Sequence, residues 1–140
     1  MRPADVLPHR SPFLFVDELI DVVPGHRARG RWHLTGEEPF FKGHFPGQPT
    51  LPGVLMIEAM AQLAGIALLA GTPRPDRIPL FGGIDKARFR RIVVPGDVLT
   101  MEVSLDRIGT FAGRSTGHAW VDHELACEAR MLFIVARDHQ

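Results

Sequence analysis

A histidine and a glutamate fourteen residues apart are the side chains of this sequence best suited to catalysis. His44 lies in a segment rich in glycine and proline, residues 43–53, and Glu58 interrupts the apolar run that follows it. A glycine-rich loop can hold an imidazole at the edge of a cleft, and histidine is the natural base at pH 7. A carboxyl buried in an apolar run has a raised pKa, which suits a general acid. His44 and Glu58 are therefore candidates for a base and acid pair.

Gly53, between the loop and the apolar run, could supply a third catalytic group. Its N–H would lie in the first turn of a helix, where amides lack intrahelical partners and the helix dipole favours negative charge. A developing oxyanion could bind there. Base, acid and oxyanion donor beside an apolar helix predict proton abstraction next to the carbonyl group of an apolar substrate.

The polar residues of the apolar run share one side of the predicted helix, because Glu58, Gln62 and Gly65 are four and seven residues apart. This stripe either faces solvent or buries a carboxyl for catalysis, and in the second case Gln62 would orient Glu58. Other chemistry has little support: there is no Gly-x-Ser-x-Gly motif, no nucleotide-binding glycine motif and no metal-ligand spacing among the histidines. We expect neither a metal nor a cofactor.

The elements that must position these residues form an α+β pattern. Residues 16–23 and 27–34 read as strands joined at Pro24-Gly25, residues 54–70 as a helix ended by Gly71-Thr72-Pro73, and residues 99–106, 111–120 and 125–135 as further strands. The prediction is a single domain, an antiparallel sheet wrapped around one apolar helix. Residues 71–79 are expected to be a mobile loop.

The composition of the chain excludes several classes of protein. Sixteen basic and 16 acidic residues among 140 give no overall attraction to nucleic acid or anionic membranes. The single cysteine and the absence of a signal-like N-terminus favour the cytoplasm. Because the apolar run contains Glu58 and Gln62, a core helix is favoured over a membrane span.

Four motifs resemble the β-hydroxyacyl-acyl carrier protein dehydratases of the FabZ type. They are "LPHRSPFLFVDEL" at 7–19, "EPFFKGHFPGQPTLPGVLMIEAMAQLAG" at 38–65, "GGIDKARFRRIVVPGD" at 82–97 and "CEARMLF" at 127–133. The resemblance implies a hot-dog fold, a homodimer whose two sheets join, commonly a trimer of dimers, and no cofactor beyond the phosphopantetheine arm of acyl carrier protein.

The resemblance also implies roles for individual residues. His44 matches the catalytic histidine, Glu58 the catalytic carboxylate and Gly53 the glycine whose N–H polarises the thioester carbonyl, with His44 and Glu58 of one site coming from different subunits. The implied reaction removes water from a (3R)-3-hydroxyacyl thioester to give the trans-2-enoyl thioester. Phe45, with Phe40 and Phe41, would line an acyl tunnel or belong to the ordinary core.

A basic run, Lys86, Arg88, Arg90 and Arg91, would either dock acyl carrier protein or protect an edge strand from pairing. His9 is interpreted as structural. Two departures from the family pattern are Ser11, where an aromatic residue is common, and Asp122-His123 at a hairpin, where Asp-Gly is usual. The competing functions are a dehydratase-isomerase, an acyl thioesterase and a silent acyl-binding subunit; the glutamate at position 58 speaks against the isomerase.

Overall fold

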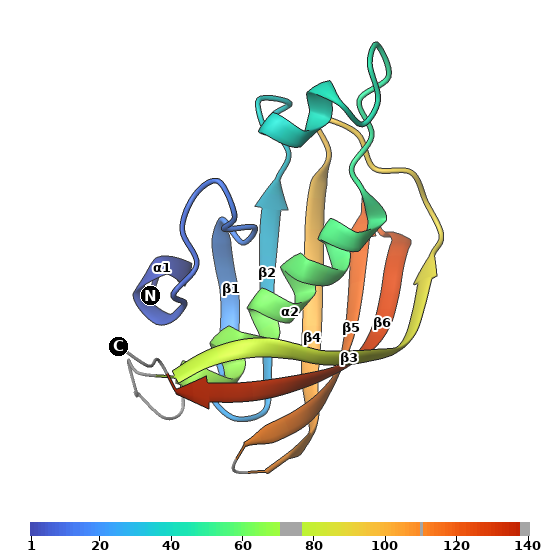
Figure 1. Cartoon of the computed structure of the whole chain (residues 1–140). Coiled ribbons are helices and arrows are strands. Elements are labelled where there is room, and N and C mark those ends of the chain that lie inside the picture. The colour runs from blue at the N-terminus through green and yellow to red at the C-terminus, as the bar shows by residue number, and fades with distance from the viewer. Residues whose placement is uncertain (71–76, 110, 138–140) are drawn as a thin grey trace.

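One six-stranded antiparallel sheet curls around a long helix, as Figure 1 shows for the computed structural model, which describes residues 1–70, 77–109 and 111–137. The helix is α2 (Gly53–Ala70). The strands are β1 (Glu18–Val23), β2 (Arg27–His33), β3 (Arg77–Phe89), β4 (Val98–Ile108), β5 (Ala112–Val121) and β6 (Glu124–Arg137). Two short helices, α1 (Pro3–Val6) and η1 (Pro39–Lys42), complete the described elements. The predicted α+β architecture is confirmed.

The strand order β1-β2-β4-β5-β6-β3 places β3 at one edge of the sheet. After α2 the chain forms β3, which pairs with β6 at the edge of the sheet. It then returns to the middle of the sheet as β4, which pairs with β2. Bulges in β3 between Phe81 and Gly83 and between Ile84 and Lys86 increase the local twist. The sheet therefore bends enough to enclose the helix on its concave side.

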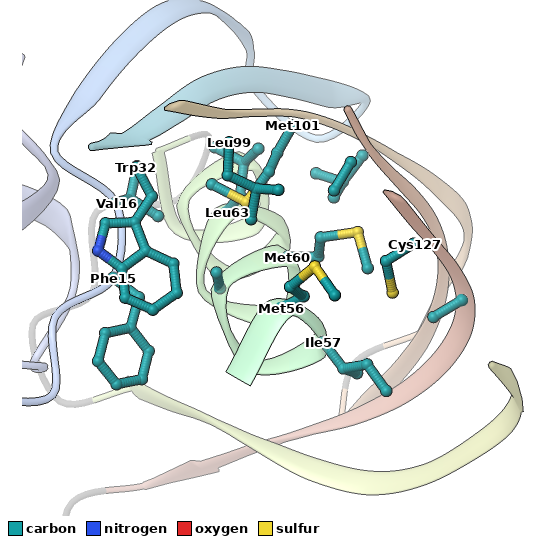
Figure 2. Packing of buried hydrophobic residues seen from close by; sticks show 14 of the residues in the cluster. Phe15, Val16, Trp32, Met56, Ile57, Met60, Leu63, Leu99, Met101 and Cys127 are labelled. Atoms are coloured by element: carbon teal, nitrogen blue, oxygen red, sulfur yellow. The ribbon is translucent and has the colours of Figure 1, made fainter. Parts of the chain in front are cut away.

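Helix α2 is apolar on nearly every side because the sheet surrounds it. Met60, Leu63 and Ile66 have no exposed surface, and β4 packs Leu99 and Met101 against the helix (Figure 2). By length and composition this helix could span a membrane, but 61% of it is buried inside the protein. It is the core helix of the fold, as predicted.

Most observed boundaries lie within one or two residues of the predicted ones, and two differences need comment. The first strand starts at Glu18, two residues later than predicted, and Val16 before it is buried in the core. The prediction of a loop over residues 71–79 falls mostly outside the described residues; residues 77–79 are the start of β3 and pair with β6. The sequence pattern concealed this edge strand because two adjacent glycines interrupt it.

The turn between β5 and β6 has a defined conformation. Val121 pairs with Glu124, so Asp122 and His123 form a two-residue loop, with φ angles of 49° and 69°. Positive φ at both positions is the geometry of a type I′ hairpin turn. His123 therefore adopts a conformation that usually favours glycine.

Candidate active site

The loop that carries His44 is held in place mainly by its own backbone. Phe45 and Gln48 exchange backbone hydrogen bonds across a turn in which Gly47 has a φ of 76°. The N–H of Thr50 donates to the carbonyl oxygen of His44 at 2.7 Å. The N–H of Leu51 donates to the carbonyl oxygen of Val93, in the segment between β3 and β4, at 2.8 Å. The glycine and proline residues thus build a fixed loop at the start of α2.

The imidazole of His44 is oriented by a single hydrogen bond. Its Nδ1 lies 2.7 Å from the carbonyl oxygen of Thr50. A carbonyl oxygen can only accept, so Nδ1 carries the proton and the lone pair of the neutral ring is on Nε2. The ring also stacks on Phe45 at a centroid distance of 4.0 Å. His44 is therefore set up to accept a proton at Nε2.

Gly53 is the first residue of α2, and a side chain there would collide with Phe89. A Cβ atom at this position would lie 2.7 Å from two ring atoms of Phe89. Among the hydrogen bonds of the described residues, none uses the N–H of Gly53. This amide is thus available at the positive end of the helix dipole.

Glu58 is largely buried, so the solvent-facing alternative for the polar stripe is wrong. The side chain of Glu58 is 18% exposed. Gln62, the next polar residue of the stripe, is only 1% exposed. Burial raises the pKa of Glu58 above its ordinary value, and a hydrogen bond from Gln62 to Oε2 partly offsets this effect. The carboxyl therefore holds its proton to a higher pH than a solvent-exposed glutamate does, which suits a general acid.

A cavity of about 270 Å³ lies beside Glu58. Its polar residues are His9, Glu58, Gln62 and Ser115, and the other lining side chains are apolar and come from α2, β3, β6 and the N-terminal segment. Two of them, Leu80 and Phe81, belong to the edge strand β3. The cavity can hold an apolar chain with one end near the carboxyl.

His44 does not share this cavity within one chain. None of the described residues that line it comes from the loop 43–53. His44, near the start of the loop, and Glu58, in the second turn of the helix, thus do not line this cavity together in one chain.

His9, which the sequence analysis interprets as structural, is a polar residue that also lines the cavity beside Glu58. Its Nε2 lies 3.7 Å from Oε2 of Glu58, and its side chain is only 19% exposed. The motif "LPHRSPF" was the available signal. Nothing in local sequence, however, indicated that this segment folds back onto α2.

The aromatic residues near the loop have different surroundings. Phe41 is buried and Phe40 packs against it, with Trp32 and Phe15 close to Phe40, so both Phe40 and Phe41 belong to the core. Phe45 is 52% exposed beside His44. Of these three phenylalanines, only Phe45 remains a candidate for substrate contact.

The basic run divides into paired and unpaired side chains. Arg90 forms an ion pair with Glu128 at 3.2 Å, and Arg91 pairs with Glu124 at 3.3 Å. Lys86 and Arg88 are exposed on β3 and form no ion pair with the described residues. Within the basic run, Arg88 and Lys86 are thus the members without an ion pair among the described residues. The pKa of Glu128 is nevertheless lowered by the hydrogen bond from Arg90 and, to a smaller extent, by the charge of Lys86.

The single thiol is not a candidate nucleophile. Cys127 is fully buried, and burial, together with the nearby carboxylate of Glu128, raises its pKa to about 12. A thiol with this pKa is almost entirely protonated near pH 7, so it is unreactive.

Comparison with known proteins finds relatives that match nearly the whole chain. The FabA-like domain family matches residues 7–130. A protein of Desulforamulus reducens named 3-hydroxyacyl-[acyl-carrier-protein] dehydratase FabZ is 50% identical over 94% of this chain and 93% of its own length. A protein of Moorella thermoacetica with the same name is 49% identical over 93% of this chain and 91% of its own length.

Solved structures show the same fold at low sequence identity. The dehydratase heterocomplex ApeI:P from Xenorhabdus doucetiae matches 98% of this chain and 92% of its own, with a TM-score of 0.84 and 19% identity. A sigma28-regulated virulence protein from Campylobacter jejuni matches 99% of this chain and 98% of its own, with a TM-score of 0.73 and 16% identity. The chain adopts the hot-dog fold and belongs to the FabA-like domain family, together with curated relatives named FabZ.

Proposed function

We propose that this protein removes water from a (3R)-3-hydroxyacyl thioester carried on acyl carrier protein and releases the trans-2-enoyl thioester, a step of fatty-acid synthesis. The names of its relatives, which are about half identical over nearly the whole chain, give the substrate class. One structural observation carries the chemistry: a buried carboxyl with a raised pKa, Glu58, lines an apolar cavity. An acyl tail fits such a cavity while its β-hydroxyl group meets the acid.

In the proposed reaction, Nε2 of His44 takes a proton from C2 of the substrate. The electrons of that C–H bond delocalise onto the thioester oxygen and then form the C2–C3 double bond as the C3–O bond breaks and Glu58 gives its proton to the departing hydroxyl, which leaves as water. The N–H of Gly53 donates to the thioester oxygen while it carries negative charge. His44 then loses its proton and Glu58 regains one, so no cofactor is required.

The proposed active site is completed by a second copy of the chain. Large apolar side chains are exposed at the β3 edge beside the Glu58 cavity, where Leu80 is 50% and Ile84 is 48% exposed. Others are exposed at Phe45, which stacks on His44 and is 52% exposed, and at Val54 in the first turn of α2, which is 66% exposed. An unpaired strand edge with apolar side chains favours pairing with another chain. A homodimer formed at β3 would bury both patches and bring His44 of one copy to Glu58 of the other.

The proposed partner is acyl carrier protein. The proposed location of the protein is the cytoplasm. Lys86 and Arg88, the unpaired members of the basic run, would attract its acidic surface. Assembly of these dimers into a larger oligomer, such as a trimer of dimers, is part of the same proposal.

The direct experiment follows the ultraviolet absorbance of the enoyl thioester while the purified protein acts on 3-hydroxyacyl-acyl carrier protein. Wild-type protein should give turnover without added metal or nucleotide. His44→Ala and Glu58→Gln should each lower kcat by about 10²–10⁴-fold, the usual contribution of a general acid or base. A parallel assay for free thiol detects thioesterase activity. Thiol release without enoyl product, or full activity in both variants, would overturn the proposal.

A further inference from the structure

The segment that precedes β1 folds back over the acid of the proposed active site. The guanidinium of Arg10 donates to the carbonyl oxygens of Leu7 and His9, at 2.8 and 2.7 Å. Gln62 holds the other end of the segment through Phe13 and Phe15. His9, between these anchors, is therefore placed against Glu58 by contacts on both sides.

The contact between His9 and Glu58 involves only one oxygen of the carboxyl. Nε2 of His9 lies 3.7 Å from Oε2, and the amide of Gln62 donates to the same atom at 3.0 Å. In a neutral carboxyl the carbonyl oxygen is the better acceptor, so the hydrogen bond from Gln62 to Oε2 favours the acid proton on Oε1. Among the hydrogen bonds of the described residues, none engages Oε1, which leaves it for a substrate.

The surroundings of His9 keep its ring neutral. Its Nδ1 is buried and has no hydrogen-bond partner among the described residues. Burial lowers the pKa of His9, and the neighbouring cation Arg10 lowers it further. Other than His9 and Arg10, the elements around Glu58 present Gln62, Ser115 and apolar side chains, none of which titrates. A neutral ring excludes water from Glu58 without placing a positive charge beside it.

We propose that His9 is a positioning residue whose neutral imidazole covers Oε2 of Glu58, so that the carboxyl keeps its proton and presents Oε1 to the substrate. This inference rests on the proposed role of Glu58 as the acid. A smaller side chain at position 9 would admit water, and a cationic one would favour the carboxylate; either change would lower the pKa of Glu58. A neutral amide of similar reach would preserve the environment.

The test measures the titration of Glu58 directly, by infrared difference spectroscopy of the protonated carboxyl, against the same protein carrying Glu58→Gln. We expect His9→Ala to move the midpoint down by about one pH unit and His9→Lys to move it further, since each change favours the charged form. His9→Gln should stay close to wild type. His123→Ala, in the exposed turn between β5 and β6, is the control and should leave the midpoint unchanged.

The pH dependence of kcat/KM for the dehydration is the second measurement. In His9→Ala, activity should fall at a lower pH than in wild type, and His9→Gln should restore the wild-type profile. A merely structural role would lower activity equally at every pH. A Glu58 midpoint that stays at the wild-type value in His9→Ala, or that falls equally in His9→Gln, overturns the proposal. Because the infrared titration needs no substrate, this failure is distinguishable from the failure of the proposed reaction.

Discussion

The amide of Gln62 donates to Oε2 of Glu58, one helical turn earlier, at 3.0 Å. The same side chain donates to the carbonyl oxygen of Phe13 at 3.0 Å and accepts from the N–H of Phe15 at 2.8 Å. One buried amide thus orients the proposed acid and ties the segment before β1 to the core helix.

Replacement of Gln62 by leucine should destabilise the protein. The change removes three hydrogen bonds and leaves the buried N–H of Phe15 without its partner, and each buried polar group left unpaired costs about 1–3 kcal/mol. Urea unfolding would measure the loss. The control is Gln48→Leu, whose side chain is exposed. If Gln62→Leu unfolds at the same urea concentration as wild type, this amide does not anchor the segment.

The raised pKa of Glu58 predicts how stability changes with pH. Between 4.5, the ordinary value, and the raised value, folded Glu58 holds a proton that the unfolded chain has released. The free energy of unfolding therefore contains a contribution from Glu58 that falls as pH rises through this window. Glu58→Gln removes this contribution, so the variant should gain stability relative to wild type as pH rises from 4 to 8. The measurement is the free energy of unfolding of both proteins across this pH range. A stability difference between Glu58→Gln and wild type that stayed constant or declined with rising pH would contradict the account.

A side chain at Gly53 should disturb the start of α2 through Phe89. Because a Cβ atom would lie 2.7 Å from the ring, Gly53→Ala must displace Phe89 or the helix terminus, and kcat should fall with the shift of the amide. The double variant Gly53→Ala/Phe89→Leu has room for the methyl group and keeps the N–H, so it should recover most of the activity. Comparison with Phe89→Leu alone isolates the clash. Activity in the double variant that stays well below that of Phe89→Leu alone would contradict the clash as the cause of the loss.

Arg88 should affect the binding of acyl carrier protein and not the chemistry. Arg88→Glu reverses an exposed, unpaired charge, and we expect KM for the carrier-linked substrate to rise by about tenfold at low salt, because charge complementarity steers association. KM for a small thioester without the carrier should stay the same, and added salt should reduce the difference. Arg27→Glu, exposed on β2 near the other edge of the sheet, is the matched control. Equal effects on both substrates would place Arg88 in the site itself.

Local sequence patterns predicted most of the fold. The apolar run from Val54 to Ala70 indicated a wrapped helix, and alternation from Leu99 to Asp106 indicated a half-buried strand; both are confirmed within a few residues. The edge strand β3 was largely missed because it is exposed and contains Gly82 and Gly83. Its place depends on pairing with β6, which no local pattern encodes.

The chemistry of the candidate site was only partly predictable. Residue type and spacing singled out His44, Gly53 and Glu58, and burial of Gln62 against Glu58 agrees with the predicted orienting role. His9 could not be assigned, because its contact with Glu58 joins residues 49 positions apart in the sequence. The pairing of His44 and Glu58 across two copies remains a prediction.

The central claim, that His44 of one subunit works with Glu58 of another, is tested most directly by mixing two inactive variants. His44→Ala and Glu58→Gln each abolish both sites of their own dimer, whereas a hybrid dimer retains one site with both residues intact. After subunit exchange of equal amounts, random pairing in a two-fold symmetric dimer predicts recovery of about one quarter of wild-type activity. Exchange confirmed by mass spectrometry without any recovery of dehydration would contradict the account.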